Sequence, residues 1–279
     1  TAIACIFIYS RLSYSFLIKA MPEQEKDSII NITKHSLVLT EFPDSASIQW
    51  VLQAKDKFKP LNAPFVNFAE ISKPVWLKAA PIKLSSFSNA SIMIDQARMK
   101  TSDIYFVKDS SVIYKIEGEP YATIADLEFP GNIKSHLLPG SIVAQQPDIF
   151  LKLYSDEVVI APVFVAPKYS FDNIFAQRDI FFGMYTGVMI IMFTYNLFLF
   201  FSVKDSSYLN YIFCIFFTWA TQTALQGYFT NYFLLNEGWL NNISVCLFAN
   251  LGLEASIMFT QSFLNTKVNA PKNHKIINI

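Results

Sequence analysis

Six polar side chains recur at helical spacing inside two long apolar stretches near the C-terminal end of the chain. Each stretch carries three of them on one side of a helix, and they are Thr218, Gln222 and Gln226, followed by Asn250, Glu254 and Gln261. An ionisable group in a membrane costs at least about 2.5 kcal/mol, so it pairs with another group or serves a function. We predict that the two stripes face each other, with Glu254 protonated or hydrogen-bonded to a glutamine. Both a structural network and a signalling role are open.

Other residue types that carry chemistry are sparse. The chain lacks the nucleophile elbow, the zinc-binding H-E-x-x-H and both glycine-rich phosphate loops, and its three histidines lie in separate contexts. The three cysteines, Cys5, Cys214 and Cys246, show no metal-ligand spacing. We therefore expect no catalytic site, no metal and no cofactor. Lys and Arg balance Asp and Glu at 22 each without a basic run, so a nucleic-acid partner is not expected either.

The apolar stretches are long enough to cross a lipid bilayer. The first, residues 180–203, has no charged residue over more than the roughly 20 positions that a spanning helix needs. Residues 208–229 and 242–264 are two further predicted spans. Gly183 and Gly187 form a G-x-x-x-G pattern, which lets a neighbouring helix approach closely in lipid. We interpret it as a helix-packing face, with chance as the alternative.

Positively charged residues predict the orientation of these helices. Lys204 lies between the first two spans, and Lys267, Lys272 and Lys275 follow the third, whereas the segment between the second and third spans has no Lys or Arg. Lys and Arg concentrate on the cytoplasmic side. The sequence before the first span should then lie outside, although Arg178 at its outer end departs from the rule.

Residues 28–167 read as an all-β domain, a sandwich or jelly roll. Short alternating runs, separated by turn residues and not by helical segments, indicate antiparallel strands. The predicted strands are Ser36–Thr40, Ile48–Leu52, Val75–Leu84, Ser91–Asp95, Asp103–Lys108, Val112–Glu117, Ile133–Leu138, Asp148–Tyr154 and Val158–Val165. Residues 168–179 are the expected linker to the membrane.

Three aromatic residues of this domain could stack on a sugar ring: Trp50, Trp76 and Tyr105. The commoner role of a tryptophan in an alternating strand is core packing, which we favour for Trp76. Ligand contacts are then expected in loops. At the N-terminal end, residues 1–20 are apolar except for a few groups such as Arg11, and we interpret them as the remnant of a secretory signal, with an uncleaved helix as the alternative.

The membrane stretch resembles the membrane module of the bacterial seven-transmembrane receptors with diverse intracellular signalling modules. The resemblance is carried by Gly183 and Gly187, Tyr195-Asn196, the Lys204-Asp205-Ser206 turn and Phe263-Leu264. Upstream, the surroundings of Trp76 and Tyr105, the Glu117-Gly118 turn and DIFLKLYS resemble the companion extracellular sensor domain, a jelly roll related to carbohydrate-binding modules.

This resemblance implies a truncated receptor in the bacterial inner membrane, with its sensor in the periplasm. Four more helices and a cytoplasmic output unit, such as a histidine kinase, a diguanylate cyclase or a phosphatase, would follow. The expected partners are the lipid bilayer, a small-molecule ligand such as a carbohydrate, and a second copy of the chain. A membrane-anchored glycan-binding or adhesion protein and a transporter component are the alternatives.

Overall fold

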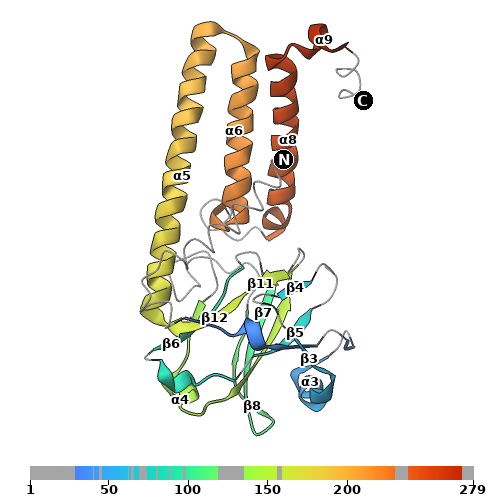
Figure 1. The fold of residues 1–279 in the computed structure, drawn as a ribbon, viewed down its shortest axis with the longest axis vertical. Helices are drawn as coiled ribbons and strands as arrows, with labels where there is room; N and C mark the ends of the chain where they lie inside the picture. Colours follow the sequence, from blue (N-terminus) through green and yellow to red (C-terminus); the bar gives the residue numbers. More distant parts are fainter. Residues whose placement is uncertain are drawn as a thin grey trace. The chain divides into compact units, whose positions relative to one another are not determined.

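In the computed structural model the chain divides into two compact units, Thr1–Gln177 and Arg178–Ile279. Figure 1 shows its helices and strands. The structure describes residues 29–39, 41–43, 46–61, 63, 66–68, 74–79, 81–87, 89–96, 99–118, 135–155, 159–229 and 238–271.

The first unit contains a β-sandwich of two antiparallel sheets. One sheet has six strands in the order β3 (Lys59–Pro60), β2 (Leu37–Leu39), β5 (Val75–Lys78), β10 (Asp148–Tyr154), β7 (Thr101–Lys108) and β8 (Ser111–Ile116). The other has four strands in the order β1 (Ile30–Asn31), β12 (Val163–Pro167), β6 (Ala90–Ile94) and β9 (Ser135–Leu137). A separate pair joins β11 (Val159–Ala161) to β4 (Val66–Phe68). Strands that follow one another along the chain repeatedly change sheet, which confirms the predicted β-sandwich.

The core lies between the two sheets and follows from the alternation of side chains along each strand. In β7, Ile104 and Phe106 point into this core, whereas Tyr105 and Val107 belong to a second cluster on the outer face of the same sheet. Ile92 and Val165 enter the core from the four-stranded sheet. Because successive side chains of a strand point to opposite faces, each apolar outer face needs a cover of its own.

Helix α3 (Ile48–Gln53) covers the outer face of the six-stranded sheet, where Ile48 and Val51 pack with Trp76 and Phe150. The predicted strand Ile48–Leu52 is therefore wrong. Its apolar residues three apart suit a helix, and the Ser47 side chain caps that helix by accepting a hydrogen bond from the Trp50 backbone N–H. The short length of the segment concealed the helical period.

Helix α5 (Lys168–Val203) begins directly after β12 and covers the outer face of the four-stranded sheet. Phe171, Ile174 and Phe175 are buried against Met93 and Phe164. The interval 168–179, expected to be a linker, is thus helical throughout, and the first turns of the helix are buried against the outer face of the four-stranded sheet. No Pro or Gly interrupts it between Lys168 and Gly183, and its apolar residues recur at helical spacing.

The second unit contains the rest of α5, then α6 (Ser206–Leu225), α8 (Gly238–Phe263) and the short α9 (Thr266–Asn269). By length and composition, α5 and Ile243–Phe263 of α8 can each cross a membrane. Helix α6, also predicted as a span, is not among them, and its polar side chains, among them Asn210 and Gln222, lower its hydropathy. That α6 crosses the bilayer stays a prediction.

A two-residue turn joins α5 to α6. Lys204 ends α5 in the left-handed conformation, with φ of 57°, and its backbone N–H donates to the Phe200 carbonyl. Asp205 then caps α6, since its carboxylate accepts a hydrogen bond of 2.8 Å from the Ser207 backbone N–H. This hydrogen bond lowers the pKa of Asp205.

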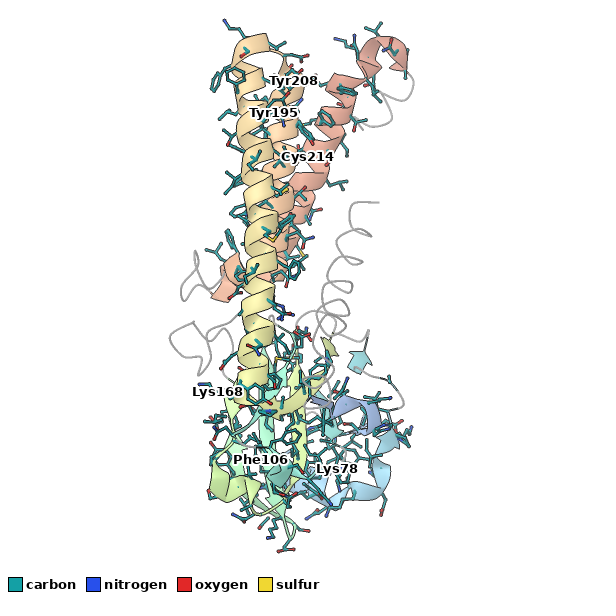
Figure 2. The ribbon with its side chains drawn as sticks, turned by 60° about the vertical axis from the view of Figure 1, so that its left-hand side comes forward. Lys78, Phe106, Lys168, Tyr195, Tyr208 and Cys214 are labelled. Atoms are coloured by element: carbon teal, nitrogen blue, oxygen red, sulfur yellow. The ribbon has the colours of Figure 1, made fainter. Side chains whose placement is uncertain are left out.

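Replacing Phe106 with Ala should destabilise the sandwich by about 3 to 5 kcal/mol, because the ring is fully buried between the sheets (Figure 2) and its removal leaves a cavity. Val112→Ala is the matched control, since Val112 is 37% exposed and its loss should change stability by less than about 0.5 kcal/mol. The urea concentration at which the full chain loses protease resistance measures both. Equal losses would contradict the described core.

Candidate functional site

Helices α6 and α8 pack against each other along their lengths through small and polar side chains. The Ser207 and Ser262 hydroxyl oxygens are 2.9 Å apart, and the Cys214 sulfur (labelled in Figure 2) is 3.1 Å from the Ser256 hydroxyl. Between these levels, the Asn210 amide donates to the Met258 carbonyl at 3.4 Å. Such side chains let two membrane helices approach closely and hydrogen-bond where lipid offers no partner.

At Gly252 of α8 the two helices are close enough for an added side chain to contact α6. A Cβ atom at this position would lie 3.4 Å from the Phe217 Cβ and 3.8 Å from the Phe217 backbone. A methyl group is at the limit of ordinary contact, and any larger side chain must push the helices apart. Next to Gly252 on the same face, Ala255 is buried. The interface thus depends on small residues in α8.

The two predicted polar stripes do not face each other in the described helices. On α6, Gln222 is buried and Thr218 is half-buried, as the prediction required. On α8, Asn250 and Glu254 are exposed, because Glu254 is two residues from Gly252 and so lies about 200° around the helix from the α6 interface. The Asn250 amide donates to the Cys246 carbonyl of its own helix.

Gln226 of α6 and Gln261 of α8, the remaining members of the stripes, are half-buried. The part of α8 that contacts α6 was missed because Ser and Gly are less conspicuous than Glu in an apolar stretch. Small residues at four-residue spacing, Gly252 and Ser256, were the available signal.

The glycine pair of α5 has no helix packed on it in the described part of the chain. A Cβ atom added at Gly183 or Gly187 would meet no described atom within 4 Å. Large apolar side chains around the pair are exposed, among them Met184 and Ile191. A packing role of Gly183 and Gly187 stays a prediction.

Helix α5 contacts α6 through a group that sequence reasoning did not identify. The Tyr228 hydroxyl, just past the end of α6, donates to the Asp179 carboxylate, and the Phe182 ring stacks on Tyr228 with centroids 4.1 Å apart. Further along, the Trp219 indole N–H donates to the Thr186 hydroxyl at 3.3 Å. The partners are 33 and 49 residues apart in sequence, so no local pattern indicates them.

In the sandwich, Trp76 and Tyr105 lie together on the outer face of the six-stranded sheet, with ring centroids 5.6 Å apart. Both are buried, and Trp50 on α3 packs against the same cluster. The structure thus brings the three candidate sugar-stacking residues together, as core under α3 and not as an open platform. Lys152 and Lys115 lie over the Trp76 and Tyr105 rings at 5.7 and 5.4 Å.

A charged network borders this cluster at the end of β8. Asp103 accepts hydrogen bonds from the Tyr105 hydroxyl and the Gly118 backbone N–H, each 3.2 Å long. Burial, with the nearby charge of Asp103, raises the pKa of Tyr105. Lys115 and Glu117 form an ion pair of 2.7 Å, whose hydrogen bond raises the pKa of Lys115 and lowers that of Glu117.

Gly118 is required at this turn, because a Cβ atom there would lie 2.6 Å from the Ser102 backbone nitrogen. The network therefore secures one edge of the sheet. Among the described residues, no group of three or more His, Cys, Asp or Glu side chains could hold a metal ion.

A long apolar helix joined by a tight turn to a helix pair with small polar contacts defines a membrane helical module. Residues 178–279 match the model of the family described as 7TM diverse intracellular signalling. The chain is similar to that family of membrane signalling receptors over this stretch, which confirms the resemblance of the membrane stretch. No curated protein matches the chain.

Gly252→Ile should separate α6 from α8, because its side chain has no room beside Phe217. When Ser207 and Ser262 are both replaced by Cys, the rate of disulfide formation in membranes reports how close the two helices are. Gly252→Ile should lower this rate about tenfold, because overpacking costs about 1 to 2 kcal/mol. Gly183→Ile is the matched control, since nothing lies within 4 Å of its Cβ position. Undiminished cross-linking in Gly252→Ile would contradict this interface.

Proposed function

We propose that the protein is the sensory part of a bacterial membrane receptor, in which the β-sandwich detects a small molecule outside the cell membrane. The helical unit is similar to a receptor family whose description is intracellular signalling, so it supplies the transmitting part. The observation that carries the proposal is helix α5, whose first turns are buried against the four-stranded sheet and whose remainder is apolar enough to span a membrane.

The length of α5 supports this role. Its 36 residues extend about 54 Å at 1.5 Å per residue, whereas a bilayer core requires about 30 Å. Phe171, Ile174 and Phe175 can therefore remain on the four-stranded sheet while the rest of the helix crosses lipid. If a ligand bound two arrangements of the sandwich with different affinities, it would shift the equilibrium between two positions of α5 by the difference in binding free energy.

The orientation rests on the cations named above, with Lys204 and Lys267 on the cytoplasmic side and the sandwich outside. In a bacterial inner membrane the sandwich would then lie in the periplasm. The output unit would lie beyond α8, in the cytoplasm, and its chemistry does not follow from the residues described.

The proposed ligand is a small molecule, with a carbohydrate as the first class to test. Trp76 and Tyr105 are buried beneath α3, so they would not stack on the ligand. Direct contacts would come from loops at the ends of the sheets. The transporter alternative relied on Gln222 and Glu254 facing each other, whereas Gln222 is buried and Glu254 is exposed in the described helices.

An alkaline phosphatase fused after Gln177 should be active, because that enzyme folds only outside the cytoplasm. The same enzyme fused after Lys204 should be inactive, whereas green fluorescent protein at that position should fluoresce. The ratio of the two reporter activities at each position measures the orientation. Active phosphatase at Lys204 combined with inactive phosphatase at Gln177 would place the sandwich in the cytoplasm and remove the basis of the proposal.

The exposed carboxyl of Glu254 gives a second test, because a receptor bundle should cover it with protein. In native membranes, an apolar carbodiimide should modify Glu254 slowly, because neighbouring helices block the reagent. After denaturation in dodecyl sulfate the rate should rise at least about tenfold, which corresponds to a barrier to access of about 1.4 kcal/mol. Glu254→Gln identifies the labelled residue. Equal rates in the two states would mean that Glu254 faces lipid and is not part of a covered network.

A further inference from the structure

The attachment of α5 to α6 differs in kind from that of α6 to α8. Helices α6 and α8 approach closely along their lengths, with Gly252 against Phe217 and three polar contacts between them. No comparable approach of backbones joins α5 to α6 in the part of the chain that the structure describes. Helix α5 is held instead by individual side chains, the Asp179–Tyr228 hydrogen bond and the Trp219–Thr186 hydrogen bond.

We propose that Asp179, Phe182 and Tyr228 form a latch, which holds α5 on the α6–α8 pair in one of two arrangements of the receptor. This inference rests on the proposed function and deepens it, because it names the contact that a signal from the sandwich must break or make. The latch is the group of these three residues. Asp179 and Phe182 are one helical turn apart on α5, so they face the same side.

The chemistry of the latch is selective. The Tyr228 hydroxyl donates to a carboxylate oxygen, and hydrogen bonds to a charged acceptor are about twice as strong as neutral ones. Tyr228 is only 7% exposed, and its ring lies nearly parallel to Phe182, with 13° between the planes. A swing of α5 away from α6 would separate Tyr228 from both Asp179 and Phe182 at once, so the latch has a closed and an open state.

The backbone of α6 is shaped to present Tyr228. Helix α6 stops at Leu225, and Gly227 adopts φ of 80°, a left-handed conformation that residues with side chains rarely adopt. The Gly227 N–H donates to the Ala224 carbonyl, which fixes the turn. Tyr228 is therefore set by a rigid turn at the end of the packed α6–α8 pair, and the movable partner is Asp179.

The position of Asp179 along α5 connects the latch to the sandwich. It follows the buried Phe175 by one helical turn, and an unbroken helix transmits displacement from one residue to the other. The first part of the membrane module to respond to a movement of the sandwich face is thus the latch. The Trp219–Thr186 contact, two turns further, would respond later and by less.

Distance measurements between spin labels on α5 and α6 test the latch in the full chain, in lipid nanodiscs and without ligand. Val188→Cys and Phe213→Cys carry the labels, because both positions are exposed on their helices. The three natural cysteines are replaced by serine, which preserves the hydroxyl contact at Ser256. Tyr228→Phe keeps the stacking and removes the hydrogen bond, and should raise the population of a second distance about tenfold.

Tyr211→Phe is the matched control, because Tyr211 lies on α6 and its ring contacts Phe259 of α8, with centroids 4.9 Å apart. It should leave the distances unchanged. Asp179→Asn keeps the size of the side chain and an acceptor oxygen, and should give a smaller change in the same direction. If Tyr228→Phe does not fold, the spin-label distances in Asp179→Asn test the latch.

Distances in Tyr228→Phe and Asp179→Asn that match those of the unmodified protein would overturn the latch, and so would an equal shift in Tyr211→Phe. These outcomes concern only the helices. They are distinct from failure of the receptor proposal, which the reporter fusions measure independently, since a chain of either orientation can keep or lose the contact.

Discussion

The four-stranded sheet has two apolar faces, and the need to cover both determines how the chain enters the membrane. The inner face, with Ile92 and Val165, packs on the other sheet. The outer face, with Met93 and Phe164, is covered by the first turns of α5. Since burying a large apolar side chain contributes about 1.5 to 3 kcal/mol, Phe171 and Phe175 hold the start of α5 firmly on the sheet. The same helix then continues as a segment apolar enough to cross a membrane.

Association of the helices in the second unit has a different cause. Lipid is as apolar as the helix surfaces, so the hydrophobic effect does not drive the helices together. Helices α6 and α8 associate through close packing at Gly252 and hydroxyl contacts such as Ser207 with Ser262. Helix α5 carries bulky side chains on most of its surface and relies on a few specific partners. Small and polar groups thus determine how closely each pair of helices packs.

Much of the fold was predictable because strands and membrane spans have strong periodic or compositional signals. The alternation in β7 and β10 and the uncharged run of α5 were recognised from sequence alone. Helix α3 was missed because six residues give too little of a helical period against a background of strands. The interval before Ile180 was expected to be a linker because its charges obscured the spacing of Phe171, Ile174 and Phe175.

The candidate site was less accessible to sequence reasoning, for a physical reason. Helical spacing predicts that Asn250 and Glu254 share a side, which holds, but it contains no information on which side of α8 meets α6. The packing of small residues decides that, and Gly252 and Ser256 lie on the other side. The pairing of Asp179 with Tyr228 depends on the antiparallel arrangement of α5 and α6, so only a three-dimensional structure reveals it.

The turn at Lys204 and Asp205 restricts the motion that α5 can make. Two residues separate α5 from α6, and both are fixed, Lys204 by its left-handed backbone and Asp205 by its cap. There is no slack at this end, so α5 cannot slide as a free piston past α6. A rotation of α5 about this turn is the motion that the geometry allows, and the displacement is then greatest at the end of α5 farthest from the turn.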